Sequence, residues 1–164
     1  SKDDLIEEVF RRRIEQVNQV RLSELSNLRA RFGDSQIPVA DLLRAFLSPV
    51  LRIGRARDRG NNFFRLVARA HAEPSELVQR VLYSQLKEIV QIFLSELHRS
   101  LPHLTQNELS LRLAFTAGAM VQAVLMPMNM VFGKELITDE EKLVDQLVAF
   151  GVGGMMSECP RKQK

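Results

Sequence analysis

The chain has 164 residues, the size of one ordinary domain and enough to bury a single hydrophobic core. Its hydrophobic fraction of 45% and charged fraction of 26% are typical of a soluble globular protein, and a net charge of +3 does not by itself indicate nucleic-acid binding. Glycine and proline are few, and Asn-Gly or Asp-Gly hairpin signals are absent, which argues against an all-β fold.

A first helix is predicted from Ser1 to about Arg31, because apolar residues recur there at helical spacing. The arginine triplet at 11–13 is either a phosphate-facing patch or a solvated face paired with nearby glutamates, and we favour the second interpretation. Gly33 ends the helix. The apolar stripe consists of Ile6, Phe10, Ile14, Val17, Leu22, Leu25, Leu28 and Phe32.

A second helix is predicted from Pro38, a first-turn proline, to near Gly54, and Pro49 is expected to bend it. A run of arginines at its end is either an anion site or a solvated loop, and we favour the loop. These arginines are Arg52, Arg55, Arg57 and Arg59. A short third helix is predicted from about Asn61 to Ala72, and a fourth from Pro74 to about Ser100.

The stretch from Thr105 to Phe132 is predicted to be the central helix of the fold. Thr105 and Glu108 form a capping box at its start, and no charge follows Arg112 for about twenty residues. Such a run either spans a membrane or lies in a soluble core. We favour the core helix because the run contains polar residues and Pro127 would kink it. A helix that is apolar all round needs partners on every side.

A final helix is predicted to begin at Thr138, with a capping box to Glu141, and to reach about Met156. This helix has two apolar faces, and the core of a single chain would cover only one of them. The second apolar face indicates a subunit interface. Residues 1–158 are therefore expected to form the folded domain, with a disordered basic tail at 159–164. The fold prediction is all-α, an antiparallel bundle of about six helices around a central buried helix.

Catalytic motifs are missing from the sequence. There is no glycine-rich phosphate loop, no His-Glu-x-x-His and no Gly-x-Ser-x-Gly elbow, and the three histidines are far apart. The clustered methionines favour adaptable packing over copper ligation. We therefore predict a protein that is not an enzyme and that needs no cofactor or metal. The single cysteine, Cys159, excludes a disulfide framework and fits a reducing cytoplasm.

Several motifs together resemble TetR-family transcriptional regulators. Ser1-Lys2-Asp3-Asp4-Leu5 is similar to the Gly-Ser-Lys-x-x-Leu segment that opens the regulatory domain of these proteins. The stretches at 63–70, 112–115 and 147–150 are similar to a subfamily of their C-terminal domains, and the order of helices matches. The helix-turn-helix domain is absent from the chain. The chain begins without an initiator Met, so we expect that domain upstream.

The resemblance implies a homodimer in which the last two helices of each subunit form a four-helix bundle. Independently, the apolar surplus of these helices predicts a twofold interface between symmetry mates. The small residues would permit close approach of the helices of the two subunits, and the large residues would supply buried interface area. The predicted interface residues are Ala119, Ala123, Leu143, Leu147, Phe150, Gly151 and Gly154.

The resemblance also implies a small-molecule pocket among the earlier helices, and the apolar interior fits an effector such as a fatty acid or acyl thioester. Ordinary core packing would explain the same residues. The predicted lining is Phe46, Phe64, Phe93, Phe115 and Met120. Arg65 and Arg112 are candidates for orienting an acidic head group, and the alternative is that each pairs with a carboxylate such as Glu88, Glu96 or Glu108.

The predicted function is therefore that of a ligand-responsive, cytoplasmic transcriptional repressor. The chain would be its sensing and dimerising half, and would reach DNA through the missing N-terminal helix-turn-helix. The predicted partners are a second copy of the chain and a small apolar or amphipathic effector, with no membrane. The alternative is a stand-alone helical module that binds a partner protein through its surplus apolar face.

Overall fold

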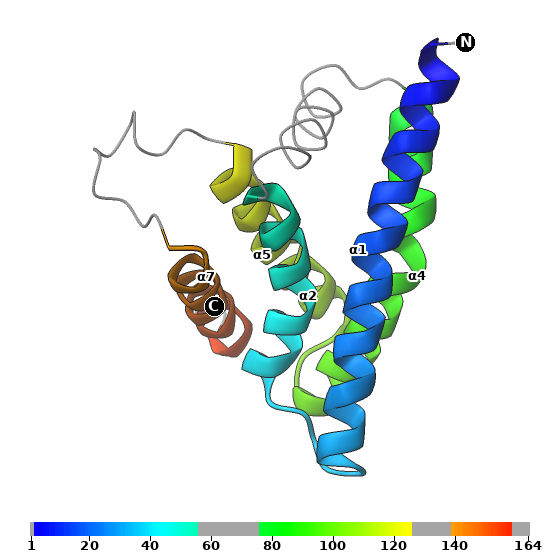
Figure 1. Cartoon of the computed structure of the whole chain (residues 1–164). Coiled ribbons are helices and arrows are strands. Elements are labelled where there is room, and N and C mark those ends of the chain that lie inside the picture. The colour runs from blue at the N-terminus through cyan, green and yellow to red at the C-terminus, as the bar shows by residue number, and fades with distance from the viewer. Residues whose placement is uncertain (1, 56–75, 126–138, 159–164) are drawn as a thin grey trace, which may run out of the picture.

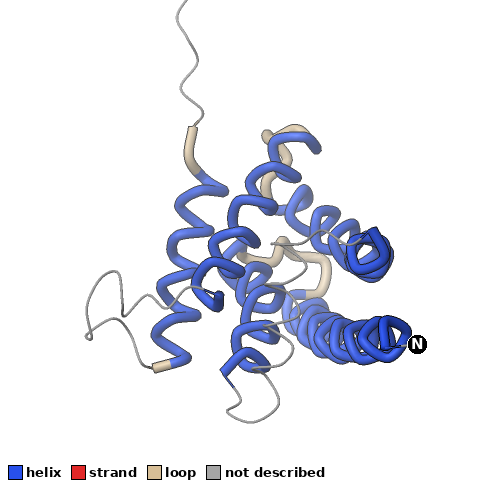
Figure 2. The backbone as a smooth tube through the Cα atoms, turned by 90° about the horizontal axis from the view of Figure 1, so that it is seen from above, coloured by secondary structure: helices blue, strands red, loops and turns tan. Residues whose placement is uncertain are grey.

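The computed structural model describes residues 2–55, 76–125 and 139–158, and within these ranges it is built of helices without strands (Figure 2). The all-α prediction is thus confirmed. The predicted helix at 61–72, the end of the predicted helix at 126–132 and the tail at 159–164 lie outside the described residues. The described helices are α1 (Lys2–Phe32), α2 (Val39–Arg55), α4 (Glu76–Ser100), α5 (Gln106–Leu125) and α7 (Glu140–Met156).

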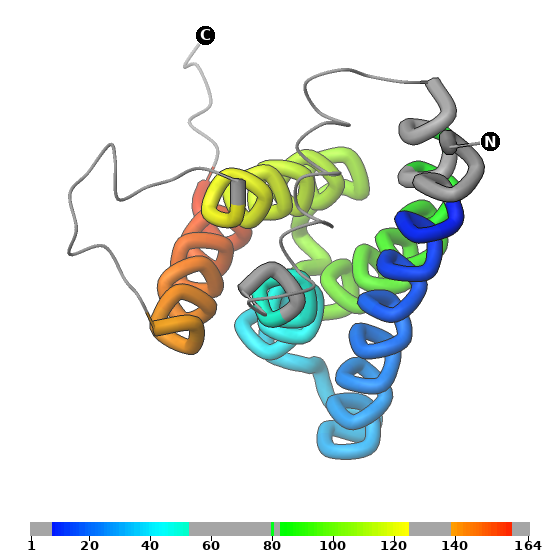
Figure 3. The backbone as a smooth tube through the Cα atoms, turned by 45° about the horizontal axis from the view of Figure 1, so that its top comes forward, coloured from blue at the N-terminus to red at the C-terminus, as the bar shows by residue number. Residues whose placement is uncertain are grey.

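Helix α2 occupies the centre of the described fold. It packs against α1, α4, α5 and α7, and Figure 3 shows it between the α1–α4 pair and the α5–α7 pair. Its side chains are buried on several sides because apolar residues cover more than one face of the helix. The buried residues of α2 include Val39, Leu42, Leu43, Ala45, Phe46, Leu47, Ser48 and Leu51.

The central position was predicted for the helix that begins at Thr105, and that assignment is wrong for the described part of the chain. Helix α5 buries one face, with Leu109 and Leu113 in the core, while Leu111 is 48% and Phe115 69% exposed. The part of α5 after Arg112 has no charged residue that would mark its exposed face. Its sequence therefore does not show which face of the helix lacks a neighbour within the same chain. The apolar circumference of α5 is therefore only partly covered in one protomer.

The two long helices α1 and α4 lie side by side and run in the same direction (Figure 1). Asn18 Nδ2 donates to the carbonyl of Gln85 at 2.9 Å, and further along both helices Arg29 Nη2 pairs with Glu96 Oε1 at 2.6 Å. Because residues later in α1 contact residues later in α4, the two helices of this pair run parallel within the bundle. Helix α7 does run antiparallel to α2, because Arg44 pairs with Asp145 while the later Arg52 pairs with Glu141.

The helix ends follow local chemistry. Gly33 has φ of 55°, a left-handed conformation that glycine adopts without strain, and its N–H donates to the carbonyl of Arg29. The predicted capping box is confirmed at α5: Thr105 N–H donates to Glu108 Oε2 at 2.8 Å, and Glu108 N–H donates to Thr105 Oγ1 at 3.2 Å. At α7 the N-cap is Asp139, whose carboxylate accepts from the N–H of Glu141.

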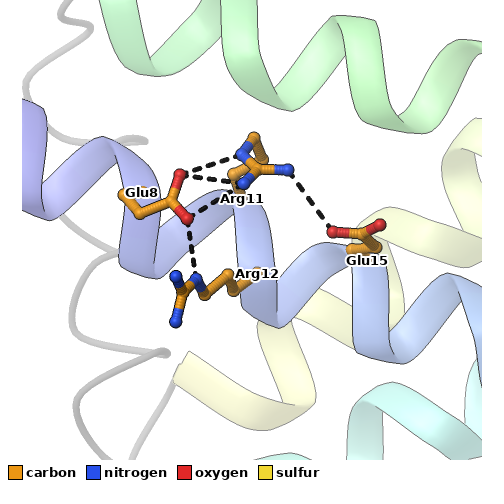
Figure 4. Close-up of polar contacts among 4 residues, drawn as sticks. All are labelled: Glu8, Arg11, Arg12 and Glu15. Carbon is orange, nitrogen blue, oxygen red and sulfur yellow. Dashed lines mark hydrogen bonds and ion pairs between the residues drawn. The ribbon is translucent and has the colours of Figure 1, made fainter.

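The arginine triplet of α1 lies on a solvated face, as we favoured from the sequence. Figure 4 shows Glu8 between Arg11 and Arg12, with Glu15 on the far side of Arg11. Hydrogen bonds from Arg12 and then Arg11 lower the pKa of the Glu8 carboxyl below its usual 4.5. Pairs at this spacing support an exposed helix, and each contributes little to stability.

Candidate functional site

Helices α5 and α7 both expose large apolar side chains. Both helices pack against α2 and against each other, so their outward faces lie next to one another. The bulky apolar side chains on this surface are Leu111 and Phe115 of α5 and Phe150 and Met156 of α7, with 48%, 69%, 64% and 62% exposure. We call this surface the α5–α7 face.

Small residues are also exposed on both helices. On α5 the exposed positions recur at helical spacing and are opposite the buried ones, and α7 repeats the pattern. The exposed small residues are Ala114, Gly118, Ala149, Gly153 and Gly154. No Asp, Glu, Lys or Arg occurs in α5 after Arg112 or in α7 after Asp145. Large apolar side chains exposed on two helices that pack together are typical of an interaction surface.

Two residues predicted for the interface instead belong to the core of the protomer. Leu147 is 7% exposed and packs in the hydrophobic core. A Cβ added to Gly151 would lie 2.9 Å from both Leu43 Cδ1 and Thr116 Cγ2, so Gly151 permits close packing of α7 on α2 and α5 within one chain. The sequence showed two apolar faces on this helix but not which one the chain's own core covers.

The other predicted interface residues remain available at the surface or its edge. Phe150 and Gly154 are exposed on the α5–α7 face, and an added Cβ at Gly154 would meet nothing within 4 Å. Ala119, Ala123 and Leu143 are half-buried along the flanks of the two helices. These five residues keep their assignment to the interface as a prediction.

Three of the residues predicted to line the effector pocket are buried in the described part of the chain. Phe46 of α2 and Phe93 of α4 are buried and meet edge to face, with ring centroids 5.1 Å apart. Met120 of α5 is also buried. Phe115 was expected to face inward and does not, because it points out from α5 opposite the core residues. Phe64 and Arg65 lie outside the described residues.

Arg112 was expected either to hold an acidic head group or to pair with a glutamate, and in the described residues one of its nitrogens bonds to backbone carbonyls of α7 and of the residue that follows it. Its Nη1 donates to the carbonyls of Gly154, Met155 and Ser157, at 3.1, 2.6 and 2.8 Å. These carbonyls lie at the C-terminal end of α7, where the helix leaves acceptors unpaired and carries partial negative charge. The guanidinium thus caps α7 and fastens it to α5.

A charged residue that the sequence analysis passed over lies in the interior. Arg21 of α1 is 2% exposed, and its Nε donates to the carbonyl of Phe46 at 2.8 Å. Its Cζ lies 4.2 Å from the centroid of the Phe46 ring, and Nη1 donates to Asn18 Oδ1 at 3.1 Å. The signal was present in the sequence, because Arg21 continues the helical spacing of Phe10, Ile14 and Val17 on the apolar stripe.

Residues 44–154 match the family model described as the tetracyclin repressor-like, C-terminal domain, and this range is more than half of the chain. The chain belongs to this TetR family. The comparison with curated proteins gives no match. The domain type is the ligand-binding and dimerisation domain of TetR regulators, a non-enzymatic fold.

The TetR assignment agrees with the positions of the motifs that suggested it. The stretches at 112–115 and 147–150 lie on α5 and α7 inside the matched range, and so does the stretch at 63–70, which lies outside the described residues. Among the helices that are described, none is both long and apolar enough to cross a membrane. The same residues hold no group of three or more His, Cys, Asp or Glu placed to bind a metal ion.

Proposed function

We propose that this chain is the effector-sensing and dimerising part of a ligand-responsive transcriptional repressor that works in the cytoplasm. The observation that carries the proposal is the match of residues 44–154 to the TetR C-terminal domain. DNA would be bound by an N-terminal helix-turn-helix connected to the start of α1. Effector binding between the helices would change the spacing of the two DNA-binding heads of a dimer.

The α5–α7 face supports the dimer part of the proposal. It presents Phe115 and Phe150 to solvent in one protomer, and pairing with a symmetry mate would bury both copies of each residue in a self-complementary patch. An obligate interface of this type buries about 2,000 Å² or more in total. Exposed glycines such as Gly118 and Gly154 would let the helices of the two subunits approach closely.

The aromatic contact between α2 and α4 supports the effector part. Phe46 and Phe93 face each other in the interior, and Met120 supplies a soft, adaptable side chain from α5. We assign these residues, together with Phe64 and Arg65, to the effector site. An apolar or amphipathic small molecule is the class of ligand that such a lining would accept.

Melting curves with a panel of saturated fatty acids, their alcohols and a long-chain acyl thioester test the effector role. A ligand at a hundredfold excess over its dissociation constant should stabilise the domain by about 2.7 kcal/mol. If no compound in the panel raises the melting temperature, the effector proposal fails in favour of the alternative, a module that binds a partner protein through the α5–α7 face.

A further inference from the structure

Two glutamines interrupt the uncharged parts of α5 and α7. Gln122 is exposed near the end of α5, and Gln146 is exposed near the start of α7. Within these two described helices, the other exposed residues after Arg112 and after Asp145 are alanine, glycine, phenylalanine or methionine. Neither glutamine has a hydrogen-bond partner among the residues that the structure describes. Two polar amides thus stand without a partner on helices whose exposed side chains are otherwise apolar.

The packing of α5 on α7 brings the two glutamines to the same level along the bundle. Near the start of α5, Arg112 Nη1 lies 2.6 Å from the carbonyl oxygen of Met155. One turn further along α5, Thr116 Cγ2 would lie 2.9 Å from a Cβ added to Gly151. A step forward along α5 therefore corresponds to a step back along α7, as in an antiparallel pair of helices. The same progression places the end of α5 beside the start of α7, where both glutamines lie.

The glutamines also lie on the same sides of their helices as the exposed aromatic residues. Gln122 follows Phe115 by two helical turns, and Gln146 precedes Phe150 by one turn. Both helices therefore carry an exposed aromatic ring and, toward the same end of the bundle, an exposed amide. The α5–α7 face thus has an apolar area with a polar level at one end, formed by the two glutamines.

This polar level lies at the end of the bundle where α1 begins. Figure 1 shows that α5 ends and α7 begins toward the end that carries the N-terminus. The DNA-binding domain of the proposed regulator would be connected there. Two such domains reach one duplex only if both lie on the same side of the dimer, so the twofold axis would run along the bundle from that end. An axis in this direction brings the polar levels of the two subunits together.

Such an axis also places α5 of one subunit opposite α7 of the second copy. Gln122 of each subunit would then face Gln146 of the other, in a reciprocal pair of contacts. An amide side chain has both donors and an acceptor, so two amides satisfy each other without any charge. A shift of one subunit along the other would leave the amides buried against apolar residues, which costs free energy because their hydrogen bonds to water are lost.

We propose that Gln122 and Gln146 pair across the twofold axis and select one alignment of the homodimer. The inference rests on the proposed function, because it presupposes that the α5–α7 face binds a second copy of the chain. Apolar residues supply the buried area but tolerate several alignments, whereas polar residues in an apolar interface pair in one. Since the polar level lies at the end that would connect to the DNA-binding domains, this alignment also fixes the spacing of their attachment points.

Charged substitutions test the pairing, since both glutamines are exposed in one protomer and the variants should still fold. Gln122→Glu/Gln146→Glu and Gln122→Lys/Gln146→Lys each gather like charges at the polar level, and each homodimer should dissociate at least about tenfold more readily than the unmodified one. Mixing these two variants should give heterodimers above their statistical share in native mass spectrometry. Gln122→Glu/Gln146→Lys places opposite charges across the axis and should remain a homodimer.

The matched control is Gln19, an exposed glutamine on α1. Gln19→Glu and Gln19→Lys should dimerise as tightly as the unmodified chain and mix statistically. Statistical mixing of the two like-charge variants, homodimers of those variants as tight as the unmodified one, or dissociation of Gln122→Glu/Gln146→Lys would each overturn the inference while leaving the dimer standing. A monomeric unmodified chain would overturn the dimer part of the proposed function together with the inference.

Discussion

The Nη1 of Arg112 lies 2.6 Å from the carbonyl oxygen of Met155, and this contact joins the first half of α5 to the last turn of α7. The bond is charge-assisted, and Nη1 also donates to carbonyls on both sides of Met155. The two helices that carry the α5–α7 face are therefore fixed relative to each other inside one protomer. A rigid pair of helices is a suitable base for a subunit interface.

Replacing Arg112 by Met should destabilise the domain by about 1–3 kcal/mol, because the carbonyls at the end of α7 lose their donor. Chemical denaturation measures the loss. Arg99→Met is the matched control: Arg99 is 54% exposed, and its pair with Glu96 should contribute no more than about 1 kcal/mol. Equal effects of the two substitutions would show that Arg112 does not cap α7.

Replacing Gly151 by Ala should destabilise the domain by about 1–3 kcal/mol, as overpacking of a core does. The added Cβ would meet Thr116 Cγ2 at 2.9 Å, and Thr116 cannot turn away without losing the bond from its Oγ1 to the carbonyl of Arg112. Gly153→Ala is the control for packing inside one protomer, since a Cβ there meets no atom of the same chain within 4 Å. A Gly151→Ala chain that melts no lower than Gly153→Ala would contradict the packing described for α7.

Replacing Phe150 by Asp should produce folded monomers, because the side chain is 64% exposed in one protomer and would be buried between two. Leu147→Asp places a charge in the core and should unfold the chain. Sedimentation and circular dichroism separate these outcomes. Val20→Asp, an exposed apolar position on α1, should change neither readout. A Phe150→Asp variant that remains dimeric would remove the α5–α7 face from the interface.

Acidification should reveal the pairing of Glu8. Its folded-state pKa is lowered, first by the hydrogen bond from Arg12 and then by that from Arg11, so its contribution to stability is present above the usual pKa of 4.5. That contribution should be lost as the pH falls through the lower, folded-state value. A carboxyl ¹³C titration should therefore place the Glu8 pKa below 4.5, whereas a value at or above it would disprove the pairing.

Helical periodicity predicted the class of the fold and most helix positions. The spacing of apolar residues and the capping residues can both be read within a single short segment of the sequence. The capping box at Thr105 and the glycine stop at Gly33 were predicted for this reason. At the start of α7, Thr138 and Asp139 are both good N-cap residues, and their order alone does not decide which one caps the helix.

The assignment of helix faces was less predictable, because it depends on contacts between distant parts of the chain. Phe115 and Leu147 are both apolar residues on apolar helices, yet one is exposed and the other lies in the core. The sequence does not state which side of α5 or α7 meets α2. Arg21 was passed over because a long basic residue on a helix is usually solvated, and its burial follows from the packing of α1 against α2 and α4.

Sedimentation equilibrium of the unmodified chain at micromolar concentration tests the central claim, that this is the dimerising domain of a TetR-family regulator, most directly. The α5–α7 face should hold two copies together, so the measured mass should be that of two chains across the concentration range. A mass of one chain would contradict the account, because Phe115 and Phe150 would then remain exposed to solvent in the native state.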